Sequence, residues 1–161
     1  MDPRIKRLGK MMGDSKKPVF ELRSLDKSIS PLVKVIENPW WDEIGDAIKR
    51  CYENDGFVKL EIILPKSGYI NKISMNSSSG MFRVVAITND EDAKRQLLEW
   101  WDPNLTEYRG LVKFGEDNWD SRTISKDLVA AQNIFLEFYE TGDLGLDSLN
   151  NMRSQWERKQ N

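Results

Sequence analysis

The stretch FVKLEIILPKSGYINKISMNSSSGMFRVVAIT, residues 57–88, decides the fold class of this chain. It contains three strand-like runs, residues 57–64, 69–75 and 81–88. The two connections between them are four and five residues long, and both end in glycine. Connections this short suit antiparallel hairpins, because a parallel crossover needs roughly a dozen residues or more. The stretch therefore predicts an antiparallel β-meander.

Two amphipathic helices are predicted on either side of this meander. Asn38-Pro39 has the residue types of a helix start, with Asn as the cap and Pro at the first helical position. Apolar residues then recur at helical spacing until Asn54-Asp55-Gly56, which predicts the end of the helix. The second helix is expected to begin at a Ser125 cap and to stop at Gly142. The fold class that follows is α+β, with an antiparallel meander sheet packed with two main amphipathic helices.

Shorter elements are predicted around these. The apolar runs 18–22 and 32–36 could each be an edge strand, and residues 111–114 form a plausible further strand. Residues 90–101 are interpreted as a short helix, since their apolar side chains recur on one helical side. The segment 144–161 is expected to be a short docked helix or a frayed tail.

The charge of the chain is distributed unevenly. Residues 1–36 hold nine Lys and Arg against four Asp and Glu, whereas residues 37–161 hold fifteen against twenty-two. The net charges are therefore +5 and −7. We interpret residues 1–17 as a mobile basic arm, a solubilising tail rather than a nucleic-acid contact, because no aromatic residue is interleaved with its cations. Residues 18–161 are expected to form a single acidic domain that attracts basic partners.

The residue types also restrict the chemistry and the compartment. The sequence has no histidine and one cysteine, which excludes Ser-His-Asp and Cys-His catalysis and zinc sites built from Cys and His. Glycine-rich phosphate loops are absent from the sequence. We therefore expect no enzymatic activity, metal, cofactor or small-molecule substrate. One cysteine and the lack of a long apolar run indicate a cytoplasmic protein that neither crosses nor binds a membrane.

Two single features admit a functional and a structural interpretation. Cys51 lies on the apolar side of the first helix, so we interpret it as a small buried hydrophobe rather than a nucleophile. The pairs Trp40-Trp41 and Trp100-Trp101 are both placed on predicted helices. Adjacent helical side chains point about 100° apart, so one member of each pair is expected in the core and the other at the surface.

The candidate partner-binding residues are acidic. The segment Glu116-Asp117-Asn118-Trp119-Asp120 follows a glycine and precedes the second helix, which predicts a loop between rigid elements. Trp119 would supply a buried anchor, and Glu116, Asp117 and Asp120 would attract a basic partner. The second choice is the acidic face of the first helix around Asp42, Glu43 and Asp46.

From Phe57 onward, the order of elements resembles the immunity proteins of bacterial polymorphic-toxin and contact-dependent growth-inhibition systems. The likeness is carried by the meander 57–88, the strand 110–114 with its acidic loop, the closing helix 128–139 with Glu140-Thr141-Gly142 after it, and Trp156. It covers roughly two-thirds of the chain and excludes the basic arm and the residues after Trp156. The resemblance implies neutralisation of a toxin in the bacterial cytoplasm.

The leading hypothesis is therefore an immunity protein that binds a cognate basic toxin domain, such as a nuclease, and blocks its active site or substrate path. Two alternatives stay open at this point. One is a cytosolic adaptor or structural module, which self-association would favour. The other is a histidine-free hydrolase that uses carboxylates alone, which a close Asp/Glu pair of raised pKa in a deep pocket would favour.

Overall fold

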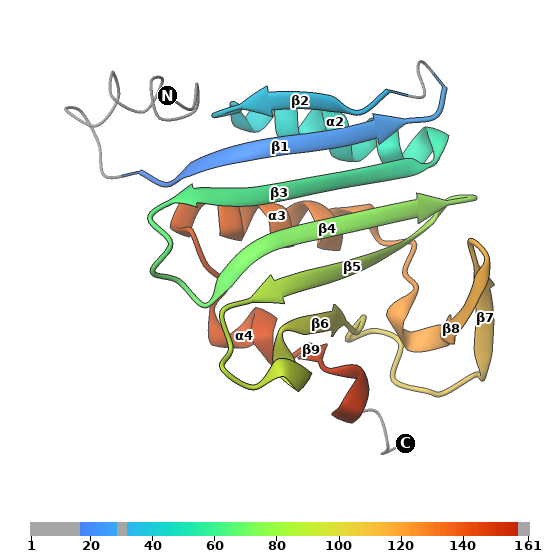
Figure 1. The fold of residues 1–161 in the computed structure, drawn as a ribbon. Coiled ribbons are helices and arrows are strands. Elements are labelled where there is room, and N and C mark those ends of the chain that lie inside the picture. The colour runs from blue at the N-terminus through green and yellow to red at the C-terminus, as the bar shows by residue number, and fades with distance from the viewer. Residues whose placement is uncertain (1–16, 29–31, 158–161) are drawn as a thin grey trace.

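The main element of the molecule is a seven-stranded antiparallel sheet, described here from a computed structural model that covers residues 17–28 and 32–157 (Figure 1). Its strands, in spatial order, are β2 (Lys34–Glu37), β1 (Val19–Asp26), β3 (Gly56–Leu64), β4 (Ile70–Ser78), β5 (Met81–Thr88), β6 (Leu97–Trp100) and β9 (Met152–Arg153). The predicted α+β class and the meander, which is β3, β4 and β5, are confirmed.

The register of the sheet explains why it has one apolar face. Leu22, Leu60, Ile73, Ala86 and Leu98 lie opposite one another across five neighbouring strands, and each is at most 1% exposed. Because side chains alternate along a strand, the next row across the sheet falls on the opposite face. That row is Glu21, Glu61, Lys72, Ile87 and Leu97.

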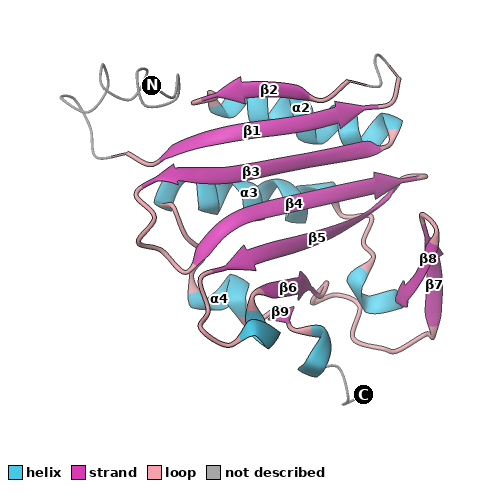
Figure 2. Cartoon of the chain, viewed as in Figure 1, coloured by secondary structure: helices cyan, strands magenta, loops and turns pink. Residues whose placement is uncertain are grey.

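Helices α2 (Trp41–Asn54) and α3 (Leu128–Thr141) cover the apolar face (Figure 2). Phe20 of β1 packs edge-on against Phe138 of α3, with ring centroids 5.1 Å apart. Gly142 ends α3 in the left-handed conformation, as its sequence position predicts. A third helix, α4 (Leu146–Leu149), is a single short turn after α3. None of the described helices has the length and apolar character needed to cross a membrane.

Both predicted helix starts are displaced by two residues. The first helix is capped at Trp40 rather than at Asn38, and the Glu43 carboxylate accepts a hydrogen bond from the Trp40 N–H. The second helix is capped by Asp127, whose side chain accepts from the Ala130 N–H. The Ser125 hydroxyl instead accepts from the Asp127 N–H, so it supports the cap without being it.

The predicted helix over residues 90–101 is wrong. A 3₁₀ turn, η1 (Ala93–Arg95), is followed by β6, which pairs with β5. Leu98 and Trp100 point into the core, and Leu97 and Glu99 point to the other face. The segment therefore follows a period of two, which satisfies its backbone against the open edge of β5. Trp100 is buried in the core, and Trp101, which follows the strand, is buried with the Arg122 and Arg153 guanidiniums over its ring. Both members are therefore buried, which contradicts the expected core-and-surface division of that pair.

The remaining strands also refine the predictions. Of the two possible edge strands, β2 lies at an edge, whereas β1 lies inside the sheet between β2 and β3. The segment after α4 supplies β9, the other edge, and the 3₁₀ turn η3 (Gln155–Glu157). A separate two-stranded hairpin is formed by β7 (Leu111–Phe114) and β8 (Asp117–Asp120), followed by the 3₁₀ turn η2 (Ser121–Thr123). The predicted basic arm lies outside the described residues, except for Lys17.

Candidate functional site

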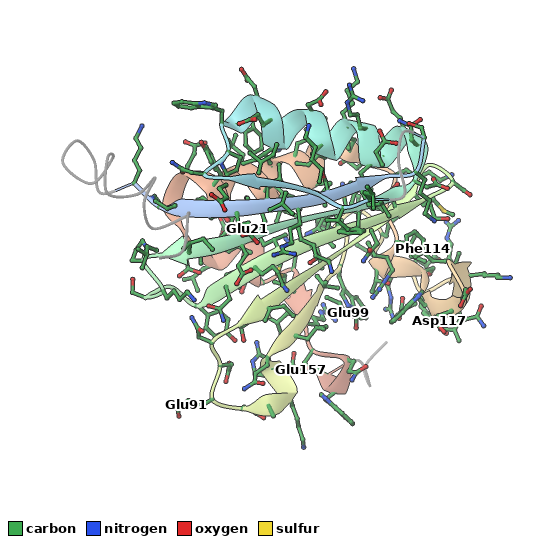
Figure 3. The ribbon with its side chains drawn as sticks, turned by 45° about the horizontal axis from the view of Figure 1, so that its top comes forward. Glu21, Glu91, Glu99, Phe114, Asp117 and Glu157 are labelled. Atoms are coloured by element: carbon green, nitrogen blue, oxygen red, sulfur yellow. The ribbon has the colours of Figure 1, made fainter. Side chains whose placement is uncertain are left out.

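The first predicted binding segment, residues 116–120, is the turn and second strand of the β7–β8 hairpin rather than a loop. Gly115 has a φ of +63°, which allows the tight turn between Phe114 and Asp117. Glu116 and Asp117 are exposed at this turn, and Figure 3 places Asp117 on the hairpin, apart from Glu21 on the large sheet. Both carboxylates are therefore exposed to solvent.

Asp120 is not available to a partner, which corrects its assignment to the binding site. It is 6% exposed, and its two oxygens accept hydrogen bonds from Nε and Nη2 of Arg122 at 3.0 and 2.7 Å. These hydrogen bonds raise the pKa of the Arg122 guanidinium above its ordinary value. Arg122 is itself buried, so Asp120 serves as its structural counter-ion.

Trp119 is half-buried and already engaged within the chain. The Arg83 guanidinium lies 3.6 Å from the centroid of its ring, a cation–π contact that holds the hairpin against β5. Arg83 also forms a buried ion pair with Glu99 of β6. The predicted free anchor is therefore a packed residue that offers only part of its surface.

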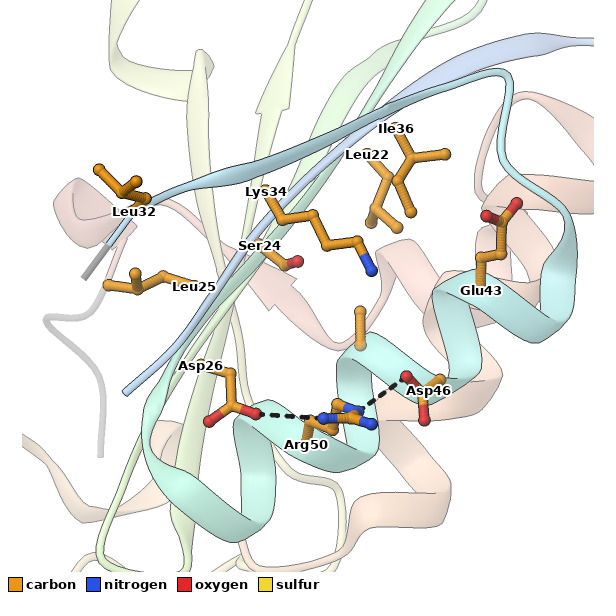
Figure 4. A pocket seen from close by; sticks show the side chains of 11 residues that line it. Leu22, Ser24, Leu25, Asp26, Leu32, Lys34, Ile36, Glu43, Asp46 and Arg50 are labelled. Carbon is orange, nitrogen blue, oxygen red and sulfur yellow. Dashed lines mark hydrogen bonds and ion pairs between the residues drawn. The ribbon is translucent and has the colours of Figure 1, made fainter. Parts of the chain in front are cut away.

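The second predicted set lies on the first turns of α2, and the structure separates its members. Asp42 is exposed and does not line the pocket that its neighbours Glu43 and Asp46 line. Glu43 and Asp46 line a pocket between β2 and α2, which we call the β2–α2 pocket (Figure 4). Figure 1 shows β2 and the β7–β8 hairpin at different ends of the molecule, so the two predicted acidic surfaces are not brought together.

The β2–α2 pocket has a volume of about 370 Å³. Its aliphatic side chains come from β1, from β2 with the residues just before it, and from α2. Charged groups surround them. Lys34 extends from β2 across the pocket toward α2 (Figure 4). The charged lining consists of three carboxylates and two cations, a net charge of −1. The lining residues are Leu22, Ser24, Leu25, Asp26, Leu32, Lys34, Ile36, Glu43, Asp46, Ala47 and Arg50.

Asp26 is the carboxylate of this pocket with the most unusual environment. Its Oδ1 accepts hydrogen bonds from the Ser28 N–H and hydroxyl at 2.9 and 2.7 Å, and chiefly the hydroxyl bond holds the pKa of Asp26 below its ordinary value. Its Oδ2 is buried without a hydrogen-bond donor among the described residues, and Arg50 Nη1 lies 3.9 Å away. Arg50 instead donates from Nε to Asp46 at 2.9 Å. One carboxylate oxygen beside the pocket is therefore buried without a hydrogen bond, with Arg50 as its nearest cation.

Exposed apolar side chains surround the same edge of the sheet. Leu32, which lines the pocket, is 77% exposed, and Trp40 at the start of α2 is 70% exposed. Val33 and Val35 are also exposed. Trp41 packs against the core, which confirms the expected division of the Trp40-Trp41 pair. Large apolar side chains gathered at one edge are typical of a surface that binds another protein.

Sequence reasoning identified Glu43 and Asp46 but missed Asp26, Leu32 and Lys34. These residues come from a strand end and from the edge strand, so only the pairing of β1 with β2 places them beside α2. The signal that could have pointed to this site was the apolar run 32–36. As a short edge strand it leaves some of its apolar side chains exposed.

The described residues give no support to a reactive thiol or a metal site. Cys51 is 1% exposed, as predicted, and burial raises its pKa to about 12. Within residues 17–28 and 32–157, no group of three Cys, Asp or Glu side chains is placed to hold a metal ion.

Comparisons with known proteins give a family and a fold. Residues 22–148 match the family described as a family of unknown function, DUF6911. A solved structure described as a hypothetical protein from Neisseria gonorrhoeae is similar, with a TM-score of 0.56 and 17% identity. The similarity covers 77% of this chain and 88% of that one, and at this identity it shows a shared fold. No curated protein matches the sequence.

Proposed function

We propose a function for this member of DUF6911, the family of unknown function to which the chain belongs. In this proposal the protein is an immunity protein that binds a cognate basic toxin domain, for example a nuclease, and neutralises it in the bacterial cytoplasm. The observation that carries this proposal is the β2–α2 pocket, where aliphatic side chains are surrounded by Asp26, Glu43 and Asp46.

The shape and charge of the pocket suit a long basic side chain. Lys and Arg have aliphatic stems that pack on apolar surface and charged ends that stay near carboxylates or water. In the β2–α2 pocket the stem would lie against Leu22 and Ile36, and the cation would reach Glu43 and Asp46. The exposed Leu32 and Trp40 extend the contact beyond the pocket. A basic partner would therefore find both apolar area and negative charge at one edge of the sheet.

The hairpin contributes in a different way. Glu116 and Asp117 are exposed, and exposed charges at the rim of an interface mainly accelerate association. Trp119 is held by Arg83, so it is a weaker candidate for an energetic anchor than Trp40. We assign the hairpin a steering role and the β2–α2 pocket the main contact.

The experiment uses the toxin domain encoded in the reading frame beside this gene. Co-expression of the intact chain with that domain should restore bacterial growth, and the purified proteins should form a stoichiometric complex. Asp46→Lys should weaken the complex about tenfold or more, whereas Asp42→Lys, on the same helix but outside the pocket, should change the affinity less than about threefold. Equal effects of the two variants would remove the pocket from the interface, and growth arrest despite co-expression would contradict the immunity function.

One alternative has an observation in its favour. The Asn38 N–H donates to the Phe20 carbonyl, so alternation along the strand turns the main-chain groups of Val35 away from β1. An edge of this kind can pair with another strand, which fits an adaptor or structural module that self-associates. Sedimentation of the purified chain distinguishes the two functions, since an immunity protein needs no self-association to bind its toxin.

The hydrolase alternative is less well supported. A carboxylate that acts as a general acid needs a raised pKa. The two described carboxyl groups with shifted pKa values, Asp26 and Asp90, are both shifted downward.

A further inference from the structure

A second pocket lies near the opposite edge of the large sheet, around Trp101. Trp101 follows β6 and is 6% exposed. The Arg122 guanidinium lies 4.4 Å from the centroid of the Trp101 ring and 4.9 Å from that of Tyr108. The Arg153 guanidinium also lies 4.4 Å from the Trp101 ring centroid. Two arginines from distant parts of the chain thus converge on one indole ring.

The two arginines differ in their counter-ions. Arg122 is fixed by the paired hydrogen bonds to Asp120, which use its Nε and Nη2 and leave its Nη1 group outside that pair. Arg153 is exposed and forms no ion pair with any residue in the described ranges. A guanidinium has five N–H donors and no acceptor. Arg153 therefore presents a full set of donors whose charge no carboxylate of the described chain neutralises by direct contact.

Both arginines line a cavity of about 350 Å³, which we call the Trp101 pocket. Its wall also includes Leu105, Thr106 and Asp102. The Asp102 oxygens accept hydrogen bonds from the Ser125 hydroxyl at 2.6 Å and from the Asn104 N–H at 2.8 Å. Two arginines and one aspartate line the pocket, and Asp120 balances the charge of Arg122.

We infer that the Trp101 pocket binds an organic carboxylate, with Arg153 as the residue that receives it. The planar fork of an arginine matches the two oxygens of a carboxylate. Stacking on Trp101 fixes the plane of the Arg153 guanidinium, and the apolar side chain of Leu105 offers a surface for the body of the ligand. Because Arg122 is already paired with Asp120, Arg153 is the guanidinium that remains for a single carboxylate group.

A donor in the wall of the pocket supports this inference. The Nε1–H of Trp101 is buried and has no hydrogen-bond acceptor within the described part of the protein. A buried donor without an acceptor is costly, and such groups are rare in folded proteins. The NMR resonance of this indole N–H also reports on binding, because its chemical shift changes with the environment of the ring.

This inference does not depend on the immunity function. β2 and β9 are the two opposite edges of the sheet, so the β2–α2 pocket and the Trp101 pocket are separate surfaces. A carboxylate could come from a free organic acid or from the C-terminus of a peptide. Both sources share the chemistry that Arg153 recognises, and the experiment below separates them.

The test is a titration of the full-length protein followed by the indole N–H resonances of its six tryptophans, with Trp101 assigned from a Trp101→Phe variant. Benzoate should shift the Trp101 resonance with a Kd of about 1 mM, a usual affinity for a fragment-sized ligand. Benzamide, which has the same ring without the charge, should not shift it. A short peptide with a free C-terminus, compared with its C-terminal amide, shows whether the pocket accepts a peptide end.

Variants decide whether Arg153 is responsible. Arg153→Gln should weaken benzoate binding about tenfold or more, and Arg153→Lys should give an intermediate loss because it keeps the charge without the fork. Arg109→Gln is the control, since Arg109 is exposed, paired with Glu107 and outside the pocket lining. The inference is overturned if benzoate leaves the Trp101 resonance unchanged, if benzamide acts equally, or if Arg153→Gln and Arg109→Gln bind alike. Asp46→Lys, which tests the proposed function, should leave benzoate binding intact.

Discussion

At the scale of single residues, the molecule carries two buried ion pairs beneath its hairpin. Arg83 pairs with Glu99, and Arg122 pairs with Asp120. Each arginine also stacks on a tryptophan, Trp119 or Trp101 respectively. Burying a charge is costly unless its partner and hydrogen bonds are present, so each of these residues depends on its counter-ion.

Removal of one such counter-ion should destabilise the fold. Asp120→Asn would leave the Arg122 charge buried without compensation, and we expect a loss of about 3 kcal/mol in the free energy of unfolding. Urea titration followed by tryptophan fluorescence measures this loss. The matched control is Asp117→Asn in the same strand, where exposure predicts a change within about 0.5 kcal/mol. Similar unfolding midpoints for both variants would show that Asp120 is dispensable.

The thiol of Cys51 should be chemically silent in the folded protein. With a pKa of about 12 and almost no exposed surface, it forms too little accessible thiolate at pH 8 to react with a disulfide reagent. Denaturation should release a full equivalent of reactive thiol. Cys51→Ala should cost about 1 kcal/mol of stability without affecting partner binding. Fast labelling of the native protein, or a stable variant that no longer binds, would give Cys51 a functional role.

The pH dependence of Asp26 can be predicted with its sign. Because the folded-state pKa lies below the ordinary value of 3.8, ionised Asp26 stabilises the fold above that pH. This contribution disappears as the pH falls through the lowered pKa. Ser28→Ala removes the hydroxyl hydrogen bond and should raise the pKa of Asp26. A carbon-detected NMR titration of the Asp26 carboxyl group follows the change, and an identical titration curve in both proteins would contradict this explanation.

At the scale of elements, two glycines on either side of the α2–β3 connection differ in whether their position tolerates a side chain. Gly56 begins β3 with a φ of +137°, and a Cβ there would lie 1.8 Å from the Leu25 carbonyl oxygen. Gly45 lies inside α2, and a Cβ there would meet no atom within 4 Å. The first position requires glycine for the close pairing of β1 with β3, and the second does not.

The two alanine substitutions should therefore change stability in opposite directions. Gly56→Ala should destabilise the protein by more than about 3 kcal/mol, because the clash is with main-chain atoms. Gly45→Ala should stabilise it by about 0.5 to 1 kcal/mol through helix propensity alone. Thermal unfolding by circular dichroism measures both. A neutral Gly56→Ala variant would show that the start of β3 can move away from β1.

The elements that sequence predicted well are those whose pattern is local. In the meander and the two long helices, apolar residues recur at a clear spacing and a glycine marks the end of the element, as Gly142 does. Residues 97–100 are too few for their period to separate helix from strand, so pairing with β5 decided their structure. The same limit applies to the sites. Nothing in the local sequence shows that Asp120 is matched by Arg122 or that Asp26 faces α2, because tertiary packing creates both environments.

At the scale of the whole molecule, the sheet has two edges of different chemistry. The β2 edge carries exposed aliphatic side chains and a pocket of net negative charge. The β9 edge carries the Trp101 pocket, which is lined by Arg122 and Arg153. The covered face holds the core, so binding functions are confined to the edges, the hairpin and the other face of the sheet.

The proposed immunity function predicts that the molecule binds its partner without catalysing a reaction. The sequence has no histidine, and its one thiol is buried with a raised pKa. We expect the purified chain to show no turnover in a broad screen of ester, phosphodiester and glycoside substrates, with and without divalent cations. Activity that copurifies with the chain and disappears in one carboxylate variant would restore the hydrolase alternative.

The last strand also determines where the molecule unfolds locally. β9 pairs with β6 at two positions, Glu99 with Arg153 and Trp100 with Met152, and beside them the Trp101 N–H donates to the Asn151 carbonyl. These contacts close a long loop in the chain, so their formation carries a large entropic cost for few hydrogen bonds. β9 should therefore detach in sub-global openings while the central strands stay paired. In such an opened state the edge of β6 is unpaired and can form hydrogen bonds with strands of other molecules. By covering this edge, β9 protects the molecule from aggregation.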